Sequence, residues 1–523
     1  MEGKSMEGKI ICPREIREIC LTGQGLTVEQ TVAVARFGAR VSISAEAVER
    51  MEESRKLTEK IVEEDFPVYS VNTGFGEFSK VRIDHGSIDQ LQKNLIMSHS
   101  CAVGQPLKEE VVRAMLLLRA NALCNGFSGI RPEVVQLLVD MLNQGVHPVV
   151  PEKGSLGASG DLAPLAHMVL PMLGMGEAVW HGQRMPGGEA LEKAGLHPVS
   201  LKAKEGLALI NGTQAMTAIG TLAFYDTLQA ARLADIALSL SMEALEALLS
   251  AFDLRVHAVR PHPGQALTAA NVRAITAGSR ILEASQHLRV QDAYAIRCAG
   301  QVHGAVRDTL DFVRRTIEVE LNSVTDNPIL FTEQGDVISG GNFHGEPMAF
   351  AFDYLGIACA ELANISERRL ERLVNPNLSN GLPAFLVRQG GLHSGFMICQ
   401  YSAASMVSEN KVLAHPASVD SIPSSANQED HVSMGTTAAR KAAQIVENTL
   451  SVLAFELMGA AQGLELRGGE PSPVCRKVQE KIREQVAFVE EDREMWKDVA
   501  AMNRLVRDGS LVELVAGMVP GFL

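Results

Sequence analysis

The chain has 523 residues, with 48 Lys and Arg against 62 Asp and Glu, and a formal net charge of -14 at pH 7. This negative charge opposes nonspecific binding to nucleic acid or to an anionic membrane, so we expect a small-molecule partner. No uninterrupted apolar run reaches the roughly 18 to 20 residues of a membrane span, and the N-terminal MEGKSMEGK lacks an apolar signal core. We therefore predict a soluble, cytoplasmic, globular protein.

The cysteines and histidines show no familiar metal-binding pattern. The eight cysteines form no CxxC pair or zinc-ligand spacing, and the sequence contains no HExxH. We expect reduced, mostly buried thiols and no metal cofactor.

Helical patterning dominates along the chain and predicts an all-α fold. Before about residue 205, shorter helices alternate with Gly- and Pro-rich loops at 70–76, 126–132 and 148–164. Longer segments rich in helix-favouring residues follow, at 215–252, 284–321, 347–374, 395–414 and 432–466. We predict an N-terminal domain of residues 1–205, and a long-helix bundle with C-terminal helices over 206–523.

The loop at 154–166 reads GSLGASGDLAPLA and has almost no side-chain bulk around Ala158, Ser159 and Gly160. Glycines at 157 and 160 allow φ values that a Cβ disfavours, so the Gly160 nitrogen can reach the Ala158 carbonyl carbon. Cyclisation and dehydration there would create an electrophilic methylidene, a chemistry that standard side chains lack. Alone, the tripeptide is typical of an ordinary turn. The GxSxG elbow of a serine hydrolase is missing.

The longer run GSLGASGDLAPLAHM, with Asp161 and Pro164 in place, resembles the signature of the aromatic amino acid ammonia-lyases and related aminomutases. The resemblance implies that Ala158-Ser159-Gly160 forms 4-methylideneimidazol-5-one (MIO) autocatalytically, without an external cofactor. It also implies a fumarase/aspartase-like helical architecture. In this family, homotetramers build each active site from loops of three subunits.

Further segments resemble the family in the same order. Tyr69, in YSVNTGFG, matches the catalytic tyrosine; its phenol, with an ordinary pKa near 10, needs a lowered pKa to act as a base. Asn211, in KEGLALINGTQ, matches the asparagine that positions the MIO group and the substrate amine. In QDAYAIR, Tyr294 and Arg297 lie three apart on one helical face and match site residues. The planar fork of Arg297 suits the substrate α-carboxylate.

Four more residues match the part of the family site that surrounds the substrate. Phe343, in SGGNFHGEP, matches an aromatic wall, with Asn342 beside the substrate carboxylate. Glu429, in PSSANQEDHVSMG, matches a position that is acidic in histidine lyases and commonly an amide in phenylalanine lyases. His99, in NLIMSHS, occupies the side-chain selectivity position and resembles the histidine type. Without the resemblance, each residue is more typical of a core or a solvated surface.

The chain departs from the histidine lyase pattern at Gly300, where proline is usual, and at Ala102 and Gln105, which replace glycine and glutamate. These changes are either neutral or alter how long the acrylate intermediate and the captured amine stay enclosed, and that retention separates a lyase from a 2,3-aminomutase. We predict conversion of L-histidine to trans-urocanate and ammonia. The alternatives are a histidine 2,3-aminomutase giving β-histidine, and a tyrosine lyase or aminomutase. A catalytically dead family scaffold and a fumarase-like lyase with an ordinary serine base also stay open.

Overall fold

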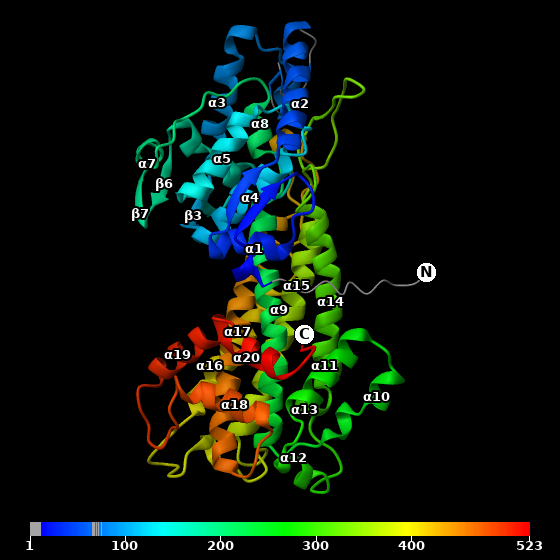
Figure 1. The fold of residues 1–523 in the computed structure, drawn as a ribbon, viewed down its shortest axis with the longest axis vertical. Coiled ribbons are helices and arrows are strands. Elements are labelled where there is room, and N and C mark those ends of the chain that lie inside the picture. The colour runs from blue at the N-terminus through cyan, green and yellow to red at the C-terminus, as the bar shows by residue number, and fades with distance from the viewer. Residues whose placement is uncertain (1–11, 65–67, 69–70, 72, 75, 523) are drawn as a thin grey trace. The chain divides into compact units, whose positions relative to one another are not determined.

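The computed structural model describes residues 12–522 except 65–67, 69–70, 72 and 75 (Figure 1). Helices account for 61% and strands for 8% of the residues that the structure describes, so the predicted all-α class is confirmed. Contacts divide the chain into two interleaved units. Unit 1 comprises Met1–Tyr225, Arg314–Phe352 and Ala417–Arg440, and unit 2 comprises Asp226–Val313, Asp353–Pro416 and Lys441–Leu523. The contiguous division at residue 205 stays a prediction.

Unit 1 is built around α4 (Glu109–Leu123), which is buried over most of its length. α4 packs against α1 (Val28–Phe37) and α5 (Pro132–Gln144). α5 has proline in its first turn and ends at Gly145 in the left-handed conformation, which are ordinary start and stop signals for a helix. The other helices of this unit are α2 (Ala45–Glu64), α3 (Ile88–His99), α6 (Leu162–Val169), α7 (Gly187–Lys193) and α8 (Glu205–Ile210).

The described strands of unit 1 are short and form small sheets. β1 pairs in parallel with β2, β3 pairs antiparallel with β5, β6 lies between β4 and β7, and β8 pairs with β9. Their bounds are β1 (Glu18–Leu21), β2 (Arg40–Ile43), β3 (Val103–Pro106), β4 (Val146–Pro148), β5 (Pro151–Lys153), β6 (Glu177–Trp180), β7 (Gln183–Pro186), β8 (Ile329–Phe331) and β9 (Asp336–Ile338).

Four long helices, labelled in Figure 1, each contribute residues to both units: α9 (Gln214–Ala244), α14 (Ala299–Glu320), α15 (Glu346–Val374) and α17 (Gly435–Arg467). Within unit 2, glycines bring α15 close to α17 and α17 close to α9. A Cβ on Gly356 of α15 would lie 3.1 Å from Ile445 of α17, and a Cβ on Gly463 would lie 3.3 Å from Ala244 of α9. The remaining helices of unit 2 are α10 (Leu254–Ala258), α11 (Pro263–Ile275), α12 (Arg280–Ser285), α13 (Tyr294–Arg297), α16 (Met397–Leu413), α18 (Pro473–Arg483), α19 (Met495–Arg507) and α20 (Ser510–Met518).

Two predicted long helices are shorter in the structure. The segment predicted as 215–252 ends as a helix at Ala244, since Glu246 adopts a φ of 52°. The segment predicted as 284–321 is divided into α12, α13 and α14. Its non-helical part contains Asp292, whose Oδ2 accepts a hydrogen bond of 2.6 Å from the Leu248 amide. The acceptor of this long-range bond lies within the non-helical segment 286–293.

Among the described helices, α15 alone is long and apolar enough to span a membrane by length and composition. However, 67% of its most apolar window is buried inside the protein, as in a core helix. α15 is therefore weak evidence for a membrane span.

Candidate active site

Three predicted site residues of unit 1, His99, Gly160 and Asn211, lie at or next to the ends of three helices. α3 ends at His99, α8 ends directly before Asn211, and α6 begins two residues after Gly160. The three helices pack against one another. Their packing thus brings these three chain segments to the same part of unit 1.

The loop that carries the tripeptide has a backbone that favours glycine at two positions. Gly157 has a φ of 65° and Gly160 a φ of 69°. A Cβ on Gly160 would overlap the backbone of Gly212, with which Gly160 forms a parallel bridge. The next amide, that of Asp161, donates to the Gly212 carbonyl at 2.7 Å. The structure therefore leaves no room for a larger third residue in the tripeptide.

The Gly157 carbonyl oxygen joins this loop to two distant segments. Ser433 donates to it from Oγ at 2.9 Å, and Gly345 donates from its amide at 3.4 Å. Gly345 follows Phe343 closely in the chain, and Ser433 follows Glu429. The segments with these two predicted substrate-binding residues are therefore tied to the tripeptide loop.

Asn211 holds the tripeptide directly, because its Nδ2 donates to the Ser159 carbonyl oxygen at 2.9 Å. The side chain is 2% exposed, and its Oδ1 has no hydrogen-bond partner among the described residues. Fully buried Arg119 supports Asn211 by donating from Nη1 to its carbonyl oxygen at 2.9 Å and to Gln214 at 2.8 Å. Burial lowers the pKa of Arg119 to about 10, against the opposing effect of Asp326. Arg119 thus keeps its charge at neutral pH.

Glu429 reaches the tripeptide through its carboxylate. Ser159 donates from Oγ to Glu429 Oε1 at 2.7 Å, and Ser424 donates to Oε2 at 2.7 Å. In the sequence between Ser424 and Glu429 lies η7 (Ser425–Asn427), whose three residues all have φ between 52° and 71°. Such a run of non-glycine residues is strained and persists only where its surroundings fix it. The two hydroxyl groups, of Ser159 and Ser424, therefore hold the Glu429 carboxylate next to the tripeptide.

His99 is half-buried, with Nδ1 3.0 Å from the Ser98 hydroxyl. Burial lowers the pKa of His99, while a backbone hydrogen bond at Leu95 and the negative charge of Glu429 act in the opposite direction. The negative charge of Glu429 therefore acts on the His99 imidazole, while burial favours the neutral form of the ring.

The remaining predicted residues of unit 1 make no hydrogen bond to the tripeptide within the described part of the chain, or lie outside that part. Phe343 is half-buried, and exposed Asn342 donates from Nδ2 to the Val324 carbonyl at 3.2 Å. Tyr69 lies outside the described residues. η2 (Gly76–Lys80), which follows the predicted tyrosine loop, contacts η7 beside Glu429.

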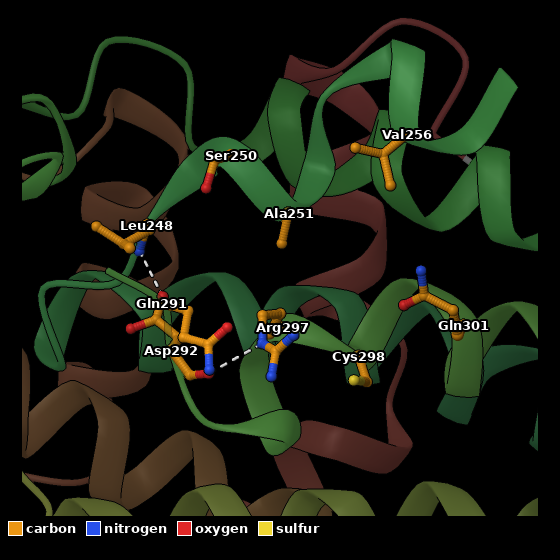
Figure 2. Close-up of a pocket in the computed structure, with 9 residues that line it drawn as sticks. All are labelled: Leu248, Ser250, Ala251, Val256, Gln291, Asp292, Arg297, Cys298 and Gln301. Carbon is orange, nitrogen blue, oxygen red and sulfur yellow. Dashed lines mark hydrogen bonds between the residues drawn. The ribbon is translucent and has the colours of Figure 1, made fainter. Parts of the chain in front are cut away.

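Tyr294 and Arg297 belong to unit 2, where Arg297 lines a cavity of about 290 Å³ (Figure 2). Its Nε donates to the Asp292 carbonyl at 3.2 Å, and its guanidinium carbon lies 4.7 Å from the ring centroid of Tyr294. The terminal nitrogens make no hydrogen bond to any described residue, so both can bind a carboxylate. The cavity is lined by Leu248, Ser250, Ala251, Val256, Gln291, Asp292, Arg297, Cys298 and Gln301.

Sequence reasoning did not identify Arg119, Gly212 or Ser433 as supports of the site. Arg119 did carry a signal, because it stands inside the apolar run MLLLRANAL. A charged residue in a buried helix needs partners, and these partners turn out to be the backbone and side chains around Asn211.

Comparison with known proteins assigns this arrangement to a family. A family model described as aromatic amino acid lyase matches residues 26–484. The chain belongs to the aromatic amino acid lyase family. The family resemblance predicted from the tripeptide loop is therefore confirmed.

Relatives of this lyase include enzymes with two different outcomes. A histidine ammonia-lyase from Alkaliphilus metalliredigens (strain QYMF) is 56% identical over 505 residues, covering 96% of this chain and 99% of its own. The crystal structure of histidine ammonia-lyase from Trypanosoma cruzi matches with a TM-score of 0.90 at 46% identity, covering 96% of each chain. A tyrosine aminomutase from Streptomyces globisporus matches with a TM-score of 0.91 at 38% identity, covering 96% and 99%. The fold is thus common to lyases and aminomutases.

Proposed function

We propose that the protein is an ammonia-lyase that converts L-histidine to trans-urocanate and ammonia. The observation that carries this proposal is the 2.7 Å hydrogen bond between Ser159 and the Glu429 carboxylate, with His99 close enough to respond to its charge. A carboxylate beside the tripeptide binds a basic imidazole better than a phenyl ring. The relatives named histidine ammonia-lyase, at 56% and 46% identity, support the same substrate.

We further propose that Ala158-Ser159-Gly160 matures to MIO. The surroundings fit this small, planar group: Gly160 lies against Gly212 with no space for a Cβ, Asn211 donates to the Ser159 carbonyl, and Asn211 Oδ1 is buried without a described partner. When formed, the group supplies a carbon electrophile that makes the substrate amine a better leaving group.

The side chains supply binding, orientation and proton transfer. Arg297 binds the α-carboxylate through its free terminal nitrogens, with Tyr294 beneath the guanidinium. Glu429 and His99 bind the imidazole, and Asn211 orients the tripeptide. Tyr69 takes the β-proton, which is not acidic in the free amino acid and so needs a positioned base. Phe343 forms the aromatic wall of the site, and Asn342 lies beside the carboxylate.

We also propose a cytoplasmic homotetramer with active sites shared between subunits. The Tyr294 side chain is 70% exposed within one chain, although the proposed chemistry requires an enclosed site. Exposed apolar residues on the long helices of unit 2 are available for assembly: Tyr354, Ile357, Ile398 and Tyr401.

Peptide mapping and a product assay test the proposed function together. The peptide containing residues 158–160 should lack the mass of two waters, and L-histidine should yield urocanate with little β-histidine. A Ser159→Ala variant should fold, keep the unmodified mass, and lose activity by about a thousandfold or more. An unmodified tripeptide in active protein would show that the proposed chemistry is wrong.

A 2,3-aminomutase is the second candidate, supported by the likeness to a tyrosine aminomutase and by Gly300. β-Histidine as the main product would favour this candidate. Turnover of tyrosine alone would contradict the proposed substrate.

A further inference from the structure

Unit 1 contains a second group of chemically capable side chains that the proposed reaction does not use. His344, Glu346 and His431 each place one ligand atom within 4.8 Å of the other two. The two imidazole rings are nearly parallel, at 4°, with centroids 5.7 Å apart. The three residues come from the two segments that are tied to Gly157.

The present partners of these groups are weak or missing. Glu346 has a buried carboxylate oxygen, Oε2, without a hydrogen-bond partner in the part of the chain that the structure describes. His344 Nδ1 accepts from the Glu346 amide at 3.3 Å, and His344 Nε2 lies 3.3 Å from the His431 carbonyl oxygen. Both contacts are long for hydrogen bonds. A buried carboxylate oxygen without a donor is costly unless a cation balances it.

We propose that His344, Glu346 and His431 bind one divalent transition-metal ion. Two imidazole nitrogens and one carboxylate oxygen suit Zn²⁺ or Co²⁺, whereas Mg²⁺ and Ca²⁺ prefer oxygen ligands. Three protein ligands leave a coordination position for water. Half-buried His344 and Glu346 lie beside exposed His431, so an ion can enter from solvent.

The position of the cluster gives the ion a positioning role. His344 directly follows Phe343, and His431 lies two residues after Glu429. An ion shared by His344 and His431 therefore joins the segment of the proposed aromatic wall to the segment of the proposed imidazole-binding carboxylate. Both segments already meet at the Gly157 carbonyl oxygen, and the ion adds a second connection between them.

Metal titration of the full-length protein tests the site. After treatment with a chelator, the protein should bind one Co²⁺ or Zn²⁺ per chain, and Co²⁺ should show visible absorption without an intense thiolate band. Loss of a residue that only hydrogen-bonds to a metal ligand lowers metal affinity by roughly 10- to 100-fold. His431→Ala and Glu346→Gln each remove a ligand itself, so each should lower the affinity by at least about 100-fold. His197→Ala, which removes an exposed histidine of unit 1, should bind as the unchanged protein does.

Stability provides a second readout that does not depend on activity. Zn²⁺ should raise the thermal midpoint of the unchanged protein and of His197→Ala, but not that of His431→Ala, because an ion that binds only the folded state stabilises it. The exposure of His431 makes this variant suitable even if Glu346→Gln fails to fold. Absence of binding, a thiolate band, or unchanged affinity in His431→Ala would overturn the proposed site. Urocanate formation without metal binding would overturn this inference alone and leave the proposed function standing.

Discussion

Asn211 donates a hydrogen bond of 2.9 Å to the carbonyl oxygen of Ser159, although 52 residues separate the two in the chain. The bond starts from the end of α8 and is supported from behind by Arg119. It holds the central residue of the tripeptide in a fixed direction.

Replacing Asn211 by alanine should lower kcat for L-histidine by about 10²- to 10³-fold, the usual cost of removing one positioned donor. Peptide mapping of residues 158–160 should accompany the kinetics, so that loss of maturation is separated from loss of catalysis. The control is Asn364→Ala, which changes an exposed asparagine of unit 2. Full activity in Asn211→Ala would contradict the positioning role.

A Glu429→Gln variant should change substrate preference. Hydrogen bonds to charged groups contribute about 1.5–3 kcal/mol, so kcat/KM for L-histidine should fall by about 10- to 100-fold relative to that for L-phenylalanine. The neighbouring change Asp430→Asn, at an exposed position, is the matched control. An unchanged ratio of the two kcat/KM values would remove Glu429 from substrate selection.

Arg297→Lys should raise KM for L-histidine by about tenfold or more, because an ammonium group cannot reproduce the two parallel hydrogen bonds of a guanidinium. kcat should change less than KM if the arginine mainly binds the substrate carboxylate. Arg255→Lys serves as control, since the Arg255 side chain is 90% exposed. A KM equal to that of the unchanged protein would argue against carboxylate binding by Arg297.

Glu243 should make the stability of the protein depend on pH. Burial raises the pKa of Glu243 to about 7 from its ordinary 4.5, although Ser472 donates an amide hydrogen bond of 2.8 Å to it. Between pH 4.5 and about pH 7 the folded protein holds a proton that the unfolded chain has lost. The stabilisation of the folded state by this proton is therefore complete below pH 4.5 and is lost as pH rises through about 7. The difference amounts to roughly 3 kcal/mol.

Glu243→Gln should remove this slope and stabilise the protein above about pH 7. Thermal midpoints measured between about pH 5 and pH 8 check the prediction. Glu484→Gln, at an exposed position, should keep the slope of the unchanged protein. An equal slope in Glu243→Gln would mean that another group is responsible.

Local sequence patterns were sufficient to predict much of the fold and the backbone conformation of the tripeptide loop. Apolar and helix-favouring residues predicted α15, α16 and α17 closely, because a long buried helix is specified by its own residues. The glycines at 157 and 160 likewise predicted a backbone with positive φ, which the structure has.

Long-range contacts account for what the patterns missed. The bond between Asp292 and Leu248 lies where a segment that otherwise reads as one helix is interrupted. The hydrogen bond between Ser159 and Glu429 joins residues 270 positions apart, and no local pattern encodes such a pairing. Only the family resemblance pointed to Glu429, whereas Arg119 had no such guide.

The hydrogen-bond partners of the tripeptide loop are synthesised much later than the loop. Asn211 lies 52 residues after Ser159, and Glu429 lies 270 residues after Ser159. Ser433 lies 276 residues after Gly157. The geometry around Ser159 therefore exists only after most of the chain has been synthesised and has folded. On the proposed chemistry, each dehydrated chain is one that has reached the native arrangement at least once. The fraction of chains with a dehydrated tripeptide would then report the fraction that has folded at least once, and mass spectrometry could measure it even after the protein is denatured.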